Sequence, residues 1–224
     1  MPVQTAATTL VSAFDNVPGF AKGLVRDLRV RWALEEIGRD YALHYLDAMK
    51  PKPDGYHDWQ PFGQVPAFDD GELRLFESGA ILLYLGEQDE RLLPRDPAQR
   101  WAATSWLLAA LNSVEPALMQ IINLDFFFAG QPWIPDARPS FAALAERRLR
   151  STEAALGERD WFAGTFSIAD IMMACVLRNL NHTDMLAAFP ALTAFKARAE
   201  ARPAFQRALA DQLAGYREPA PTGE

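Results

Sequence analysis

The chain has 224 residues, half of them hydrophobic, which suits one large domain or two small ones with a well-buried core. Charged residues make up 23% of the chain, and the net charge is −7. Nucleic acids and anionic membranes require clustered Lys and Arg, so this balance argues against a broad binding surface for either.

The first residues and the cysteine content favour a reducing compartment. Residues 1–9 contain no basic segment followed by an apolar core, so no secretory signal is expected. Apolar runs such as residues 106–111 and 168–177 are too short or too interrupted for a membrane span. The single cysteine excludes an internal disulfide. We therefore expect a cytoplasmic protein.

A strand, a helix and a second strand are predicted before residue 50. Residues 9–14 and 41–46 have strand patterns, and a helix between them starts near Pro18 and ends at Gly38. Such a unit usually forms a parallel strand pair with a right-handed crossover. Residues 50–58 are polar and rich in proline, which predicts an irregular segment with little regular helix. The inner face of the helix would carry Leu24, Leu28, Trp32 and Ile37.

Residues 60–85 predict a hairpin followed by a helix. Residues 65–69 and 73–76 are short apolar runs joined by Asp-Asp-Gly, a composition that favours a tight turn. Ser78 then opens an apolar helical run. The first amides of a helix lack intrahelical partners and lie at the positive end of its dipole. A hydroxyl and free amides together can hold a small carboxylate.

Pro66 indicates a second binding feature beside that helix. A proline at the start of a strand must lie at an edge or a bend, because it has no N–H for the sheet. If its bond to Val65 is cis, the N–H and C=O of Val65 turn outward. An extended peptide can then pair with Val65 while its carboxylate reaches Ser78. Taken singly, Pro66 is equally explained by an ordinary turn before a strand, and Ser78 by an ordinary helix cap.

Together, the segments Gln60-Pro-Phe-Gly-Gln-Val-Pro-Ala67 and Phe76-Glu-Ser-Gly-Ala-Ile81 resemble the glutathione site of the glutathione transferase family. In that family the Val-Pro bond is cis, the Val backbone pairs with the cysteinyl unit, and the Glu-Ser pair holds the γ-glutamyl end. The resemblance implies glutathione as co-substrate. It assigns the glutathione-binding roles to Gln64, Val65, Pro66, Glu77 and Ser78.

The resemblance also implies a fold and a division of the chain. We expect an α/β N-terminal thioredoxin-like domain at residues 1–90, a linker at 91–97, and an all-α C-terminal domain at 98–224. In the second domain, helices are predicted at 98–113 and 139–156, and two more start at Pro190 and Pro203. Pro116 should kink or break the continuation of the first of these. Residues 218–224 are expected to form a frayed tail.

Ser167 and Asp170 have the spacing of a capping box. The same element caps a buried central helix in the family, so Asp170 is assigned a folding role. Cys175 follows in an apolar helix interior and is expected to be a core residue, which disfavours thiol-transfer chemistry. His44 is expected in a strand and the other two histidines, His57 and His182, in exposed loops. No metal-ligand spacing is visible, so no metal is expected.

The group that would activate the glutathione thiol is not evident. A hydrogen-bond donor or positive dipole near sulfur lowers the thiol pKa, and the family usually supplies Tyr, Ser or Cys just after the first strand. Residues 15–30 contain none of these. The remaining catalytic candidates are Asn16, Arg26 and the backbone amides of the first helix. The alternative role of Asn16 is a turn or helix cap, and that of Arg26 is a solvated helix charge. Comparison with the serine-type and tyrosine-type members of the family places three apolar residues at the position of the missing group: Val17, Phe20 and Leu24.

In this family the electrophile pocket lies between the first domain and the long helices. The candidates for its wall, for which core packing is the alternative, are Phe20, Trp101, Trp106, Leu107 and residues 126–128. Phe62 matches an aromatic key that some members insert into a partner subunit, which favours a homodimer; packing within its own subunit is the competing interpretation. Ser12, in mid-strand, would contribute only if it faced the site.

We therefore expect a dimeric glutathione transferase whose bound thiolate attacks a small hydrophobic electrophile, with neither nucleic acid nor membrane as partner. A glutathione-dependent peroxidase or lyase is the alternative among enzymes. A non-catalytic binding or interaction protein is the alternative outside them. The missing hydroxyl favours the non-catalytic protein, whereas the intact Gln-Val-Pro and Glu-Ser elements oppose it.

Overall fold

A four-stranded sheet organises the first part of the chain in the computed structural model, which describes residues 3–217. The strand order is β2-β1-β3-β4. β1 (Leu10–Asn16) pairs in parallel with β2 (Ala42–Asp47) and antiparallel with β3 (Ala67–Asp69). β3 and β4 (Arg74–Phe76) form the predicted antiparallel hairpin. This is the expected thioredoxin-like arrangement.

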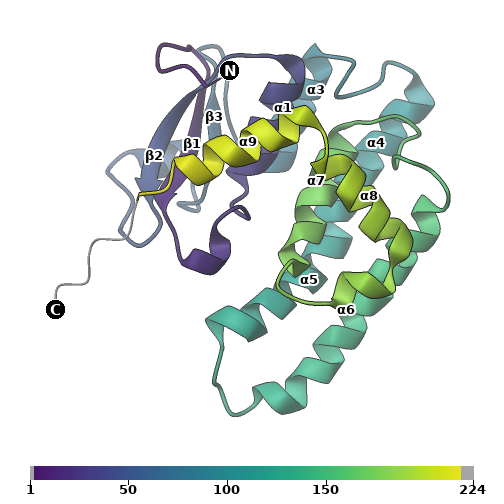
Figure 1. Cartoon of the computed structure of the whole chain (residues 1–224). Helices are drawn as coiled ribbons and strands as arrows, with labels where there is room; N and C mark the ends of the chain where they lie inside the picture. Colours follow the sequence, from purple (N-terminus) through teal and green to yellow (C-terminus); the bar gives the residue numbers. More distant parts are fainter. Residues whose placement is uncertain (1–2, 218–224) are drawn as a thin grey trace.

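Three helices accompany the sheet. α1 (Asp27–Ile37) connects the parallel strands, and α3 (Ser78–Gln88) follows the hairpin. A single helical turn, α2 (Tyr56–Trp59), interrupts the otherwise irregular segment after β2. Figure 1 shows the sheet beside α1, with the C-terminal helix α9 crossing in front of them.

The start of the first helix differs from the prediction. The chain makes one 3₁₀ turn, η1 (Gly19–Ala21), and α1 begins only at Asp27. Gly23 has φ 78°, a left-handed conformation that cannot continue a right-handed helix. A pattern of apolar residues does not reveal that interruption, because Leu24 is still partly buried, although it lies before α1. Gly38, with φ 70°, ends α1 as predicted.

The helical part begins with a long, irregular helix. α4 (Pro97–Ala109) runs through a π-helical turn, η2 (Ala110–Val114), into α5 (Glu115–Ile122) and a second π turn, η3 (Asn123–Phe127). Pro116 neither breaks nor ends the helix: the Glu115 N–H bonds to the carbonyl of Ala110 across the π turn, and the proline enters the first turn of α5.

This helical run from Pro97 to Phe127 is longer than the apolar segments considered in the sequence analysis, residues 106–111 and 168–177. By length and composition alone it is able to span a membrane. Half of its most apolar window is buried against the rest of the protein. No other helix within residues 3–217 meets the same test.

The remaining helices follow the predicted order. α6 (Ile134–Leu156) begins before Pro139, because Pro135 occupies its first turn, where a missing N–H costs nothing, and Pro139 removes a single helix bond. α6 ends at Gly157 as predicted. After it come α7 (Ile168–Leu177), the 3₁₀ turns η4 (Arg178–Leu180) and η5 (Met185–Ala188), α8 (Pro190–Glu200) and α9 (Pro203–Ala214). The tail predicted at residues 218–224 lies outside the described residues.

α7 is buried along its whole length, and its capping box forms as predicted. Asp170 accepts hydrogen bonds from the backbone N–H groups of Phe162 and Ser167, each at 2.9 Å. Burial raises the pKa of this carboxyl to about 7. Cys175 is a core residue, and burial raises the pKa of its thiol to about 11. We propose residues 91–97 as the linker between the two parts of the chain. A single hydrophobic cluster includes residues from both sides of this linker, and α1 packs against α7 and α9.

Candidate functional site

The peptide bond between Val65 and Pro66 is cis, as the resemblance implies. The bond lies just before β3, which starts at Ala67. Val65 itself is buried and belongs to a small apolar cluster with Leu46 and Tyr56. The side chain therefore anchors the turn.

A chain of three hydrogen bonds holds both sides of this cis bond. The N–H of Ala67 donates to Ser12 Oγ at 2.7 Å, and the hydroxyls of Ser12 and Tyr56 lie 2.8 Å apart. Tyr56 Oη donates its proton to the carbonyl of Gln64 at 2.6 Å, so the Ser12 hydroxyl donates to Tyr56. We call these three bonds the cis-proline clamp. Ser12 is fully buried within it, which removes Ser12 as a group that faces a ligand.

The start of α3 is connected to the helical part through buried charges. Arg29 Nη1 donates to Ser78 Oγ at 3.1 Å, and Arg29 Nη2 lies 2.8 Å from Glu115 Oε1. Arg26 Nη2 reaches the same carboxylate oxygen at 2.9 Å. Glu77, just before the helix, has φ 68° and is the one non-glycine residue with positive φ within residues 3–217. Such conformations concentrate at ligand sites.

This cluster carries a net positive charge. Burial alone would raise the pKa of Glu115, but Arg29 and Arg26 outweigh it and hold that pKa below its usual value. The carboxylate is therefore ionised between two guanidinium groups, leaving one positive charge in excess. Because Arg29 occupies an acceptor position of Ser78, the serine proton remains able to donate to a ligand.

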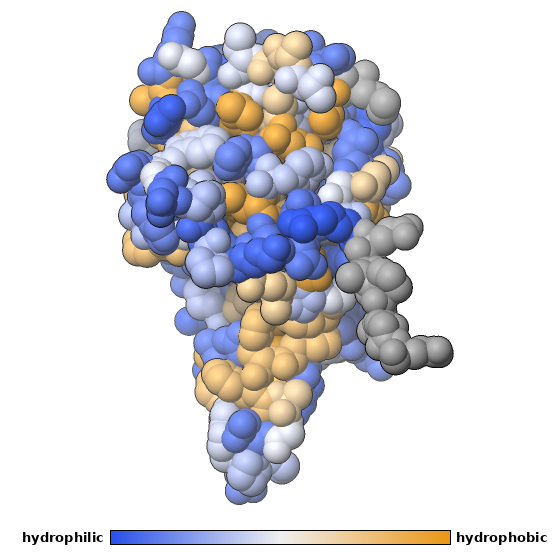
Figure 2. All heavy atoms as spheres, turned by 90° about the vertical axis from the view of Figure 1, so that its left-hand side faces the viewer, coloured by the Kyte–Doolittle hydropathy of each residue, from blue (hydrophilic) through white to orange (hydrophobic). Residues whose placement is uncertain are grey.

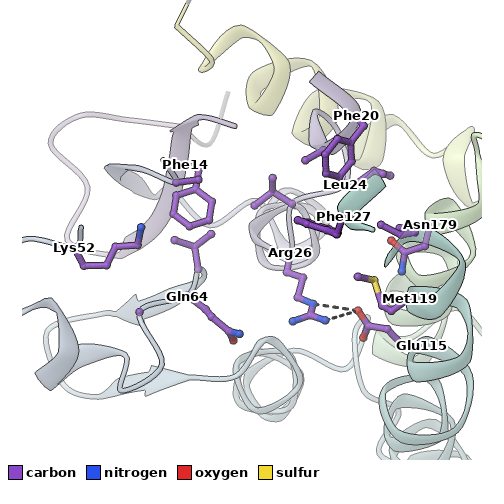
Figure 3. A pocket seen from close by; sticks show the side chains of 16 residues that line it. Phe14, Phe20, Leu24, Arg26, Lys52, Gln64, Glu115, Met119, Phe127 and Asn179 are labelled. Atoms are coloured by element: carbon purple, nitrogen blue, oxygen red, sulfur yellow. Dashed lines mark hydrogen bonds and ion pairs between the residues drawn. The ribbon is translucent and has the colours of Figure 1, made fainter. Parts of the chain in front are cut away.

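A cavity of about 410 Å³ opens between the cis-proline segment and the helices (Figure 3). Its polar groups are Lys52 and Gln64 on one side, Arg26 in the middle, and Glu115 and Asn179 on the other side. Its wall is otherwise mostly apolar and comes from β1, the loop before α1, and helices α5 and η3: Phe14, Phe20, Ala21, Leu24, Val25, Met119, Ile122 and Phe127.

Aromatic rings support the outer wall of the cavity. Phe20 stacks on Phe126 with the ring centroids 4.4 Å apart and meets Phe127 edge-on at 5.3 Å. Phe127 is 63% exposed. In Figure 2, apolar side chains gather on the narrower lower part of the molecule, formed by α5 and α6, below a band of hydrophilic side chains.

The structure brings together some of the predicted site residues. Phe20, Arg26, Gln64 and Val65 line the cavity. The other predicted glutathione ligands, Pro66, Glu77 and Ser78, do not line it; the cluster of Arg29 and Glu115 connects Ser78 to its wall.

Three predicted side chains lie elsewhere. Asn16 does not line the cavity, because its amide donates to Asp47 Oδ1 at 3.1 Å. Trp101 is 66% exposed on α4, and Trp106 packs on Phe162 with centroids 4.7 Å apart. Neither tryptophan lines this cavity, because α5 and η3, beyond the π turn, reach it and α4 does not. Their place in an electrophile pocket stays a prediction.

The histidines form no metal site. His44 lies in β2 as predicted, but His57 belongs to the short helix α2 rather than to a loop. His182 lies in a turn and pairs with Asp125 at 3.0 Å. Within the described residues, no group of three or more His, Cys, Asp or Glu side chains is placed to hold a metal ion.

Reasoning from sequence missed Tyr56, Lys52, Glu115 and Asn179. Glu115 and Asn179 lie far along the chain from the motif residues, and Lys52 and Tyr56 lie in the irregular segment just before them, so periodicity gave no signal. Glu115 had one weak mark, an acidic residue before a proline inside an apolar helix.

Two family models match this chain. The glutathione S-transferase N-terminal domain matches residues 21–87, and the glutathione S-transferase C-terminal domain matches residues 131–212. The disulfide-bond oxidoreductase YfcG of Escherichia coli is 34% identical over 190 residues, covering 79% of this chain and 86% of the relative. A glutathione S-transferase of Hyoscyamus muticus is 29% identical, covering 81% of this chain and 92% of the relative.

Solved structures are similar as well. A glutathione transferase of Pseudomonas putida, with one glutathione disulfide bound per subunit, has a TM-score of 0.76 and 29% identity over 90% of each chain. A glutathione transferase of Burkholderia graminis, with two glutathione molecules bound per subunit, has a TM-score of 0.76 and 30% identity, covering 90% of this chain and 87% of that one.

The cis-proline clamp predicts a specific stability loss. Tyr56→Phe removes one hydroxyl and leaves the buried Ser12 hydroxyl without its acceptor, so the free energy of unfolding should fall by about 1–3 kcal/mol in urea denaturation. Tyr45→Phe makes the same chemical change on a side chain that is 40% exposed, and should alter stability by less than about 0.5 kcal/mol. Equal losses in the two variants would contradict the clamp.

Proposed function

The chain belongs to the glutathione transferase superfamily, and we propose that it binds glutathione and conjugates its thiolate to a small hydrophobic electrophile. One observation carries this proposal: the cis Val65-Pro66 edge adjoins a cavity whose wall is mostly apolar. The peptide and the electrophile would thus meet at one place. The transferases with bound glutathione that resemble this chain support the same assignment.

The binding proposal follows from the charges of glutathione, which has two carboxylates and one ammonium group. The γ-glutamyl carboxylate would bind at the start of α3, where the helix dipole, the free proton of Ser78 and the net charge of the Arg26, Arg29 and Glu115 cluster all favour an anion. Lys52, at the opposite side of the cavity beside Gln64, is a cation for the glycyl carboxylate. The cysteinyl unit would pair with the Val65 backbone between them.

Thiol activation would depend on charge rather than on a side-chain hydroxyl. Arg26 lines the cavity, and its excess positive charge favours a thiolate over a thiol. Cys175 takes no part, since its thiol is buried and its pKa is raised. Once formed, the thiolate attacks the electrophilic carbon, the S–C bond forms, and the leaving group departs with its electron pair.

A second candidate function is glutathione-dependent disulfide reduction. The similarity to YfcG, named a disulfide-bond oxidoreductase, and to a transferase that binds glutathione disulfide favours it. Because this cavity contains no cysteine, glutathione itself would supply both thiols. Parallel assays with 1-chloro-2,4-dinitrobenzene and 2-hydroxyethyl disulfide separate the two functions.

We also propose that the protein acts in the cytoplasm as a homodimer. Phe62 is 67% exposed and meets Phe76, itself 40% exposed, edge-on at 6.3 Å. This pair leaves much apolar surface uncovered next to the cis-proline segment, where a partner subunit would protect it.

The first prediction concerns the serine at the start of α3. Ser78→Ala removes a hydrogen bond to a carboxylate, and glutathione affinity measured by calorimetry should fall by about 1–3 kcal/mol. Ser140→Ala, on an exposed position of α6, is the matched control and should bind like the parent protein. Unchanged affinity in Ser78→Ala would contradict the assignment of Ser78 to the glutathione carboxylate.

The second prediction concerns the bound thiol. Ultraviolet titration of thiolate absorbance should give bound glutathione a thiol pKa below that of the free tripeptide, and Arg26→Gln should raise the bound value by about one unit. Lys22→Gln, which removes an exposed cation from the same loop, should leave it unchanged. If the thiol pKa of bound glutathione equals that of the free tripeptide, the protein binds glutathione without activating it. If glutathione does not bind at all, the proposed function fails and only the family fold remains.

The third prediction concerns assembly. Phe62→Ser should convert the dimer to monomer in size-exclusion chromatography with light scattering, because it removes an apolar contact from the interface. Leu213→Ser, a similar change at an exposed position on α9, is the control. A parent protein that elutes as a monomer would overturn the proposed dimer.

A further inference from the structure

The loop between β1 and α1 supplies much of the cavity wall but has little regular structure of its own. Residues 17–26 contain one 3₁₀ turn, η1, and the left-handed Gly23. Phe20, Leu24 and Arg26 of this loop line the cavity. An irregular segment depends on contacts with the rest of the protein for its shape. The residues that hold this loop therefore also shape the cavity.

The C-terminal helix α9 holds the loop through Gln212, a side chain that is 1% exposed. Its nitrogen donates to the carbonyl of Val25 at 3.1 Å and to Asp27 Oδ1 at 2.8 Å. Both partners are acceptors, which fixes the orientation of the amide. Val25 precedes Arg26 and Asp27 follows it, so one amide connects the two neighbours of Arg26. We call this pair of hydrogen bonds the Gln212 bridge.

Arg26 is consequently held at both ends. Its Nη2 lies 2.9 Å from Glu115 Oε1 on α5, and the Gln212 bridge holds its backbone from α9. Figure 3 shows the Arg26 side chain extending from the start of α1 toward Glu115. A shift of the Arg26 backbone would move its guanidinium group within the cavity. The position of this charge therefore depends on a helix that does not line the cavity.

Other contacts hold the remaining parts of the loop. Arg178 Nη2 donates to the carbonyl of Gly23 at 3.0 Å. The backbone N–H of Arg217, after α9, donates to the carbonyl of Asp15 at 2.7 Å. Loss of the Gln212 bridge would therefore loosen the start of α1 and leave the rest of the loop attached.

We propose that Gln212 is a positioning residue, which holds the backbone of Arg26 so that the guanidinium group faces the sulfur of bound glutathione. This inference rests on the proposed activation of the thiol by Arg26. Gln212 contacts neither glutathione nor the electrophile and acts only through Arg26. The C-terminal helix thereby contributes to thiol activation from outside the cavity.

The expected effect follows from the way in which a charge interaction depends on distance. Its energy falls as the two charges separate, and it falls further where water enters between them. A displaced Arg26 would stabilise the thiolate less, which raises the pKa of the bound thiol and lowers its ionised fraction. The electrophile does not contact Gln212, so its KM should change little while kcat falls.

The test is a double-mutant cycle, with the thiol pKa of bound glutathione measured by ultraviolet titration. Gln212→Met keeps the length of the side chain and removes both hydrogen bonds. We expect it to raise the bound thiol pKa by about half a unit and to lower kcat with 1-chloro-2,4-dinitrobenzene by about threefold. In the Arg26→Gln background, the same substitution should change neither quantity, because the charge that it positions is absent.

Gln206→Met is the matched control. Gln206 lies on the same helix, but its amide donates to the carbonyl of Glu200 and not to the loop. This variant should leave the thiol pKa unchanged. If Gln212 had only a structural role, Gln212→Met would change the pKa equally with and without Arg26, and that result would overturn the inference while leaving the proposed function standing.

A second variant covers a loss of folding. If Gln212→Met does not fold, Gln212→Asn replaces it, because the shorter side chain keeps an amide but does not span both acceptors. The thiol pKa should again rise with Arg26 present and stay constant in Arg26→Gln. A titration like that of the parent protein would overturn the inference.

Hydrogen exchange without glutathione separates this inference from the proposed function. The N–H groups of Leu28 and Arg29 donate to the carbonyls of Val25 and Arg26, so they report on the start of α1. In Gln212→Met they should exchange about fivefold faster or more, whereas amides of α7 should not change. Exchange like that of the parent would overturn the Gln212 bridge. Faster exchange in a protein that does not lower the thiol pKa would instead refute the proposed thiol activation and leave the bridge as a structural contact.

Discussion

Glu115 is the buried charge on which the arrangement of the cavity depends. It stands on α5 in the helical part, yet both of its partners, Arg26 and Arg29, come from the sheet-bearing part. A lone carboxylate at 4% exposure would be very costly, so the two guanidinium groups must stay beside it. Arg29 in turn bonds to Ser78. This cluster of two ion pairs therefore joins the two parts of the chain and fixes the hydrogen-bond partner of the serine hydroxyl.

The cis-proline edge depends on a second set of contacts, this time without charges. A strand, a short helix and the segment before β3 each contribute one member to the clamp: Ser12, Tyr56 and the backbone around Val65. Each hydroxyl donates once and accepts once, so the chain is satisfied along its length. The backbone that would pair with a peptide is thus held by the two buried hydroxyls of Ser12 and Tyr56.

The cavity differs from a site in which one side-chain hydroxyl activates the glutathione thiol. Val17, Phe20 and Leu24 occupy the region where a hydroxyl or thiol is expected, and Phe20 serves as wall instead. The positive charge near Arg26 is the remaining feature that favours a thiolate. A charge acts over a longer range than a hydrogen bond and is less directional. In the proposed function, such a cavity would accommodate the glutathione sulfur with less geometric demand, which suits both addition to an electrophile and exchange with a disulfide.

Some features could be predicted from the residues alone, because local chemistry specifies them: the Asp-Asp-Gly hairpin, the end of α1 at Gly38, the capping box of Ser167 and Asp170, and the cis-proline and helix-start motifs that mark the family. The sequence did not reveal the delayed start of α1, the π turn that absorbs Pro116, or which aromatic residues face the cavity. Those depend on backbone geometry and on packing between elements that are distant in the chain. The partners of Ser78 and the place of Asn179 emerge only in the folded structure, because such contacts join side chains far apart in the chain, and no local pattern records which of them will meet.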